Sequence, residues 1–242
     1  VARSEVPQAA PPPKLASQFI PARTEHEESP RLTPLANPST PSALIAAAPS
    51  GKSTGAKAEQ LAALRGPVLT CTKCPHLVKS RTQVVFGVGN PEAELMFLGE
   101  APGADEDIVG EPFVGRAGQL LTKIIEACQL RREDVYILNV LKCRPPGNRT
   151  PLPDEVDHCR GFFERQFEVI GPEYICCLGA TAAQALLRTT EPIGRLRGRW
   201  FTYRTARVIC TYHPSYLLRY PAAKREVWED MKLLMADMGI TR

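Results

Sequence analysis

The sequence has no long hydrophobic run. Its longest apolar stretch, Ala43 to Ala48, is far shorter than the about 20 residues that a membrane-spanning helix needs. The chain also lacks a basic segment followed by an apolar one, the mark of a secretory signal. We therefore expect a soluble protein of the cytosol that contacts no membrane.

The first fifty residues have few aromatic side chains and almost no periodic apolar pattern. Ten of them are proline and ten are alanine, so this stretch cannot bury enough apolar surface to offset the entropy lost on ordering. The composition predicts a disordered tail over residues 1–57 and one folded domain over residues 58–242.

The chain has no large excess of charge of either sign. A formal net charge of +4 is weak evidence for a nucleic-acid partner. The distribution is more informative, because eight basic residues and no acidic ones lie between Pro192 and Arg225: Arg195, Arg197, Arg199, Arg204, Arg207, Arg219, Lys224 and Arg225. Such a stretch fits a solvated basic face or a surface that binds phosphates.

Four short apolar runs have the composition of strands buried on both faces of a parallel sheet. Helical patterns alternate with them, after a short helix that Gly66-Pro67 should end. The pattern predicts a three-layer α/β/α fold with a central four-stranded, mainly parallel sheet and a ligand site beyond the carboxyl ends of its strands. The predicted strands are Glu94–Leu98, Val135–Val140, Tyr174–Leu178 and Arg207–Thr211, and the helices Ala58–Arg65, Ala117–Gln129, Asp154–Ile170, Ala180–Arg188 and Ala222–Met238.

Eight cysteines are present, and nothing marks the chain as secreted. Clustered cysteines in a reducing compartment more often hold a metal than form disulfides. Cys71 and Cys74 form a C-x2-C pair, and Cys143 and Cys159 are separated by fifteen residues. Four such thiolates suit zinc or a cubane iron-sulfur cluster, and spacing does not separate the two. The other cysteines lie in apolar settings, and we expect core positions for them: Cys128, Cys176, Cys177 and Cys210.

Several short motifs occur in a fixed order along the chain. The ordered set is more specific for one family than any single motif. The motifs are a strand followed by Gly99-Glu-Ala-Pro-Gly103, then Pro112-Phe-Val-Gly115, an Asn at the end of the second strand, Cys143-Arg-Pro-Pro-Gly-Asn-Arg149, and His213-Pro-Ser215. From Cys71 to the C-terminus this set closely resembles the family 4 (iron-sulfur) uracil-DNA glycosylases. The resemblance implies base excision repair, with uracil hydrolysed from DNA. It implies a [4Fe-4S] cluster on Cys71, Cys74, Cys143 and Cys159, and a uracil pocket of Glu100, Ala101, Phe113, Asn139 and His213.

The residue types fit those roles. A glycosylase reads an extruded base by its face and its Watson–Crick edge. Phe113 can supply a stacking face, while the amide of Asn139 can donate to uracil O4 and accept from N3–H. His213 can donate to O2 as negative charge builds there. The resemblance also implies that Glu100 crowds the uracil 5-position against thymine's methyl group.

The residue that positions the attacking water has two candidates in the sequence. A related family with a Gly-Gln-Asp-Pro-Tyr loop uses its Asp, but Ala101 stands at the matching position. Glu106 and Asp107 are the candidates, and Glu106 matches the family's pocket better. We expect DNA contacts at Arg195, Arg197, Arg199, Ser215 and Arg219, with Ser215 to Arg219 forming either a wedge into the DNA or an ordinary amphipathic turn.

Three other functions remain open. The first is a non-enzymatic iron-sulfur DNA-binding module, against which Asn139 and His213 argue together. The second is a uracil-trapping relative with a Lys-Arg-Arg-Ile-His insertion, whereas Arg144 to Arg149 contains no histidine. The third is a small zinc-stabilised hydrolase. We expect a monomer that acts on single- or double-stranded uracil-containing DNA and binds a repair or replication protein through its N-terminal tail.

Overall fold

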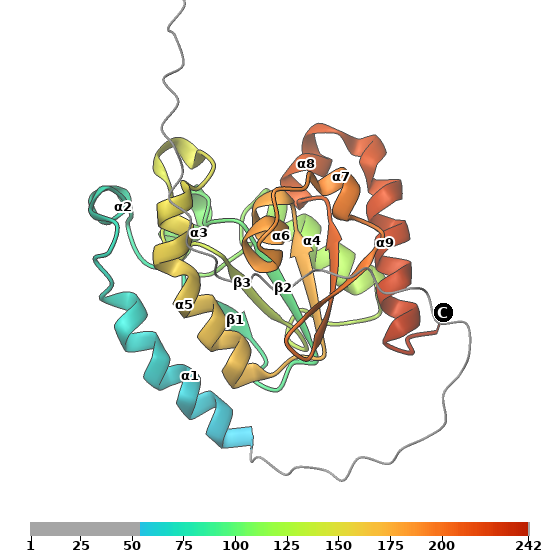
Figure 1. Cartoon of the computed structure of the whole chain (residues 1–242), viewed down its shortest axis with the longest axis horizontal. Coiled ribbons are helices and arrows are strands. Elements are labelled where there is room, and N and C mark those ends of the chain that lie inside the picture. The colour runs from blue at the N-terminus through green and yellow to red at the C-terminus, as the bar shows by residue number, and fades with distance from the viewer. Residues whose placement is uncertain (1–53, 242) are drawn as a thin grey trace, which may run out of the picture. The chain divides into compact units, whose positions relative to one another are not determined.

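A computed structural model describes residues 54–241. Its core is a six-stranded sheet with the order β1-β3-β2-β4-β6-β5 (Figure 1). The four central strands run parallel, as predicted: β2 (Leu95–Gly99), β3 (Tyr136–Asn139), β4 (Tyr174–Leu178) and β6 (Ala206–Thr211). Two antiparallel edge strands, β1 (Val88–Gly89) and β5 (Trp200–Tyr203), were not predicted. The first has two residues and the second is only partly buried, so neither gives a continuous apolar run.

Helices cover both faces of the sheet (Figure 1). They are α1 (Thr54–Leu69), α2 (Pro75–Ser80), α3 (Ala104–Val109), α4 (Arg116–Ala127), α5 (Pro153–Ile170), α6 (Ala180–Leu187), α7 (Ile193–Leu196), α8 (Pro214–Arg219) and α9 (Lys224–Asp237), with 3₁₀ turns at Pro146–Asn148 and Pro221–Ala223. Helices α1, α5 and α6 pack on one face, and α4, α8 and α9 on the other. The three-layer prediction is confirmed.

Strand β2 shows how the sequence builds two cores. Alternate side chains of a strand point to opposite faces. Met96 and Leu98 therefore join the core beneath α1, α5 and α6, while Leu95 and Phe97 join the core beneath α4 and α9. All four are at most 2% exposed, which explains why the strand reads as a continuous apolar run.

The prediction that Gly66-Pro67 ends the first helix is wrong. Helix α1 runs through Pro67 to Leu69. Val68 lies after the proline and is fully buried in the core shared with α5. The Lys57 ammonium also donates to the Ile170 carbonyl at the end of α5, at 2.7 Å. These tertiary contacts outweigh the local cost of a proline in the last turns.

The predicted tail lies mostly outside the described residues. Residues 1–53 are not described, while residues 54–57 belong to the first turn of α1. No helix within residues 54–241 has both the length and the apolar composition needed to cross a bilayer.

The strand order places a ligand site at one edge of the sheet. From β2 the chain proceeds to β3 on one side, and from β4 it proceeds to the edge strand β5 and then to β6 on the other. Neighbouring strands whose connections leave in opposite directions open a crevice at their carboxyl ends. The loops that begin at Glu100 and Gly179 lie at this point.

Candidate active site

A cavity of about 740 Å³ opens at the carboxyl ends of the parallel strands. Segments that follow β2, β3, β4 and β6 contribute to its lining. The sequence-predicted residues that line it are Glu100, Ala101, Glu106, Phe113, Asn139, His213, Ser215 and Arg219. The fold thus brings together side chains that are more than a hundred residues apart, whereas Arg195, Arg197 and Arg199 lie outside the lining.

Asn139 has a buried acceptor without a partner. It ends β3, opposite Gly99 at the end of β2, and is only 2% exposed. Its Oδ1 accepts no hydrogen bond from any described residue. An unpaired buried polar atom costs about 1–3 kcal/mol, so its presence at a cavity indicates an acceptor for the N–H of a ligand.

Phe113 is held in an uncommon backbone conformation beside Asn139. Its φ is 56°, a left-handed value that bulky residues rarely adopt. The ring is buried and lies 5.5 Å from the His213 ring, centroid to centroid. A Cβ at Gly99 would lie 2.6 Å from two Phe113 ring carbons and would also collide with Asn139 Oδ1. Only glycine at position 99 leaves room for both Phe113 and Asn139.

Glu106 braces the loop that carries Phe113. Its Oε1 accepts from the backbone N–H groups of Val114 and Gly115, and its Oε2 from that of Gly103, each at 3.0 Å. A carboxylate has about four acceptor positions. Three positions on Glu106 are occupied by these N–H groups, which leaves one position at the cavity.

The neighbouring acidic residues have different positions. Asp107 is buried and accepts from the Thr82 backbone N–H at 2.9 and 3.0 Å. It therefore fixes the segment before β1 and does not line the cavity. Asp105 is exposed and does line the cavity, a placement that the sequence analysis did not anticipate.

Glu100 is oriented by a residue of helix α6. The Thr181 hydroxyl at the start of α6 donates to Glu100 Oε2 at 2.6 Å. The carboxylate is therefore fixed at the cavity wall by a hydroxyl from across the crevice.

His213 is held in one orientation by Ser215. It caps α8, and the Ser215 backbone N–H donates to its Nδ1 at 3.1 Å. The Ser215 hydroxyl also lies 2.8 Å from Nδ1. Because a backbone N–H can only donate, Nδ1 is the acceptor, and a neutral ring carries its proton on Nε2. That Nε2–H is a donor available to a ligand.

The ring is neutral at physiological pH. Burial, with a smaller contribution from the positive charge of Arg219, lowers the pKa of His213 from 6.5 to about 4. A neutral imidazole with its proton on Nε2 matches a role as a hydrogen-bond donor and not as a fixed cation.

The lowered pKa has a measurable consequence. Between about pH 4 and 6.5, His213 is protonated to a greater extent in the unfolded chain than in the folded one. The stability that His213 contributes is therefore complete above pH 6.5 and is lost as the pH falls through about 4. We expect the melting temperature of the wild type to fall further between about pH 7 and about pH 5 than that of His213→Gln. Equal falls would show that His213 titrates normally.

The four spaced cysteines come together at the other end of the Cys143 loop. Cys71 and Cys74 lie between α1 and α2, Cys143 follows β3, and Cys159 lies on α5. Burial raises the pKa of both Cys74 and Cys159 to about 11, and neighbouring thiols among the four add to each rise. Electrostatic interactions thus link Cys74 to Cys71 and Cys143, and link Cys159 to Cys143 and Cys74.

Nitrogen donors surround these sulfurs. Arg81 Nη1 donates to Cys143 Sγ at 2.9 Å, and its Nη2 donates to the Cys71 carbonyl at 3.0 Å. His158 Nδ1 lies 3.3 Å from Cys74 Sγ. Hydrogen bonds to sulfur are a usual feature around thiolate-bound metal clusters.

Among residues 54–241, no group of three His, Cys, Asp or Glu side chains is arranged to hold a single metal ion. Four thiolates suit zinc or an iron-sulfur cluster. The remaining cysteines are buried in the core, as predicted: Cys128, Cys176, Cys177 and Cys210.

Comparison with known proteins decides the family. The model of the uracil DNA glycosylase superfamily matches residues 86–232. The type-4 uracil-DNA glycosylase of Archaeoglobus fulgidus is 47% identical over 173 residues, covering 68% of this chain and 86% of the relative. That of Thermotoga maritima is 48% identical over 170 residues, covering 68% and 88%. That of Pyrobaculum aerophilum is 42% identical over 183 residues, covering 72% and 92%. The chain belongs to the type-4 uracil-DNA glycosylases.

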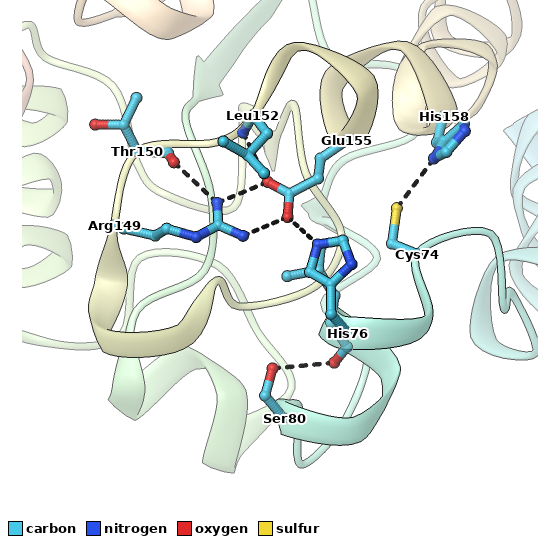
Figure 2. A network of polar contacts seen from close by, with 9 residues as sticks. Cys74, His76, Ser80, Arg149, Thr150, Leu152, Glu155 and His158 are labelled. Carbon is cyan, nitrogen blue, oxygen red and sulfur yellow. Dashed lines mark hydrogen bonds and ion pairs between the residues drawn. The ribbon is translucent and has the colours of Figure 1, made fainter. Parts of the chain in front are cut away.

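In this type-4 uracil-DNA glycosylase, the buried carboxylate of Glu155 joins Arg149 to His76 (Figure 2). Glu155 accepts from Arg149 at 2.6 and 2.9 Å, from the Leu152 backbone N–H at 2.7 Å, and pairs with His76 Nε2 at 2.6 Å. The hydrogen bonds from Arg149 lead in lowering the pKa of Glu155 to about 2, against the effect of burial. Glu155 thus joins Arg149, which lines the cavity, to α2, the helix that follows Cys74.

The basic stretch divides into two kinds of residue. Arg197 donates to buried Asp230 at 2.9 and 3.1 Å, and Thr211 also donates to Asp230, at 2.6 Å. Arg197 therefore neutralises a buried carboxylate. Arg195 and Arg199 are exposed, and Arg195 pairs with Glu191 at 3.3 Å at the surface.

The sequence analysis of this glycosylase missed several cavity residues. Arg149, Tyr212 and Tyr216 all line the cavity. Arg149 lay in the Cys143 motif and Tyr216 lay between Ser215 and Arg219, but neither was given a role. The position of Tyr212 and Tyr216 on either side of His213-Pro-Ser215 is the signal that could have found both.

Proposed function

We propose that this protein flips uracil out of DNA and hydrolyses its N-glycosidic bond, leaving an abasic site. The unpaired Oδ1 of Asn139 carries the proposal, because it is a buried acceptor at a cavity that also offers an aromatic ring and a neutral imidazole donor. Uracil presents the N–H, face and carbonyl oxygens that these groups require. Family membership supports the same substrate.

In the proposed mechanism, Phe113 stacks on the uracil and Asn139 reads its edge. The Asn139 Oδ1 accepts from N3–H while its NH₂ donates to O4. Glu100, held by Thr181, lies at the 5-position and excludes a methyl group. Ala101 leaves room for the flat base at the cavity wall.

His213 acts on the departing base. As the bond between C1′ and N1 breaks, its electron pair moves onto the uracil and negative charge grows on O2. The His213 Nε2–H donates to that oxygen. Water then adds to C1′ of the sugar, and the proton that it loses neutralises the departing uracil anion. We assign Glu106 to positioning this water through its remaining acceptor position, while it braces the Phe113 loop.

Phosphate contacts come from the exposed basic residues. Arg195, Arg199 and Arg219 are exposed and suit the DNA backbone. Arg197 and Ser215, which the sequence placed among the DNA contacts, take supporting roles in this proposal: Arg197 pairs with Asp230, and Ser215 orients His213.

We assign a [4Fe-4S] cluster to Cys71, Cys74, Cys143 and Cys159. When bound, the cluster would supply a covalent link between α1, α2, α5 and the Cys143 loop, and no electron transfer is needed for base hydrolysis. The residues around it hold the loop that leads to Arg149 at the cavity.

The proposed activity is tested by incubating the protein with an oligonucleotide that contains one deoxyuridine, followed by alkaline cleavage. We expect cleavage at that position over many turnovers and none in a matched thymidine oligonucleotide. Binding without cleavage would instead support a non-enzymatic DNA-binding module. A covalent protein–DNA adduct that survives denaturation would support the uracil-trapping alternative.

The cluster assignment makes a separate prediction. Cys71→Ala and Cys159→Ala should each lose the brown colour and most soluble expression, because a ligand and a link between segments disappear together. Cys176→Ala is the matched control, since Cys176 is a buried core cysteine of β4. It should stay coloured with a full iron content. A Cys159→Ala protein that keeps four irons per chain would refute the ligand set.

A further inference from the structure

Three tyrosines form a stacked ladder beside the cavity. The Tyr212 and Tyr216 ring centroids are 4.9 Å apart at 28°, and those of Tyr216 and Tyr220 are 4.7 Å apart at 38°. These are separations of well-packed aromatic pairs. Tyr216 lies in α8, Tyr212 precedes its cap residue His213, and Tyr220 follows its last residue. We call Tyr212, Tyr216 and Tyr220 the tyrosine ladder.

The inner end of the tyrosine ladder is fixed. The Arg197 guanidinium lies 5.3 Å from the Tyr212 ring centroid, and the buried carboxylate of Asp230 holds that guanidinium. Tyr212 and Tyr216 also line the cavity. The ladder is therefore anchored in the fold and begins at the proposed uracil site.

The outer end is open. Tyr220 is 55% exposed, and among the described residues Tyr216 is the one aromatic partner of its ring. Pro221 follows directly and restricts the Tyr220 backbone. An anchored stack thus ends in a largely exposed aromatic ring.

The charge around this ring suits a polyanion. Arg219, Lys224 and Arg225 are exposed near Tyr220 in the chain. None of the three forms an ion pair with an acidic residue in the part of the chain that the structure describes. Arg219 also lines the cavity, so positive charge continues from the cavity to the end of the ladder.

We propose that the tyrosine ladder binds unpaired DNA bases next to the flipped uracil, with one neighbouring base stacked on the Tyr220 ring. The inference rests on the proposed uracil-DNA activity. Aromatic rings beside a basic surface bind single strands in this way, without regard to sequence, because every base has a flat face. In a duplex those faces are covered by neighbouring base pairs. The contact therefore favours single-stranded over double-stranded substrate.

The test combines a protein change with a DNA change. Tyr220→Ala is compared with wild type on a single-stranded oligonucleotide with one deoxyuridine, and on the same strand with base-free spacers beside the deoxyuridine. On the normal strand we expect the KM of Tyr220→Ala to rise roughly 5- to 150-fold with kcat little changed. On the spacer strand the two proteins should have similar KM values, because the base that stacks is absent.

Two variants control for structure. Tyr220→Phe keeps the ring and should restore the KM on the normal strand. Leu233→Ala removes another exposed apolar side chain, on α9, and should leave the KM unchanged. In duplex DNA the effect of Tyr220→Ala should be smaller than in single-stranded DNA.

The outcomes separate the two proposals. An equal rise in KM on both strands would overturn the stacking role, because Tyr220 would then act without a base. An unchanged KM on the normal strand would also overturn it, while leaving uracil release intact. If the wild type releases no uracil from any strand, the proposed function itself fails.

Discussion

Replacing Asn139 with Asp should slow uracil release by up to about 10⁴-fold, the discrimination reached by sites built around a hydrogen bond. The change keeps the size of the side chain but removes its NH₂ donor. An ionised Asp would present acceptors to both O4 and N3–H, and only the second contact is favourable. The measurement is the single-turnover rate of base release, with folding, iron content and DNA affinity determined on the same sample.

The matched control for Asn139 is Asn148→Asp. Asn148 lines the same cavity, but its Oδ1 already accepts from Arg144 Nε at 2.7 Å. A carboxylate there would keep that partner, so uracil release should stay close to the wild-type rate. If Asn139→Asp released uracil as fast as Asn148→Asp, Asn139 could not be reading the base.

His213→Ala should slow base release by about 10²- to 10³-fold, the usual cost of one donor aimed at a developing oxyanion. The loss should appear in the single-turnover rate and not in the affinity for DNA, because the hydrogen bond strengthens only as O2 gains charge. The neutral Nε2–H inferred from the Ser215 contact is the group removed.

Ser215→Ala provides the comparison for His213. It removes the hydroxyl 2.8 Å from Nδ1 but keeps the backbone N–H that donates to the same atom. Release should therefore slow much less than in His213→Ala. A His213→Ala protein that loses only DNA affinity would assign His213 to binding and not to charge stabilisation.

The central sheet could be predicted because burial on both faces leaves a direct mark on the sequence. Strands β2, β3, β4 and β6 are almost wholly buried. The edge strand β5 has no such mark, because its pairing with β6 decides its structure. The passage of α1 through Pro67 likewise depends on packing against α5, which no local pattern contains.

The cavity residues could be named because short motifs carry them, but their partners could not. The left-handed backbone of Phe113 depends on close packing against Gly99 and on the Glu106 brace. The pair of Arg197 with Asp230 joins residues 33 positions apart. Contacts of this kind follow from the tertiary fold, and a single sequence shows only the residue types.

The position of Glu155 couples the assembly of the cysteine-bearing segments to DNA binding at the cavity. One buried carboxylate receives Arg149 from the cavity lining and His76 from the helix after Cys74. In a chain whose cysteine-bearing segments have not come together, one of the contacts that fix Arg149 through Glu155 would be missing. We expect an immature protein of this kind to bind damaged DNA poorly, so it would not occupy a lesion that it could not repair.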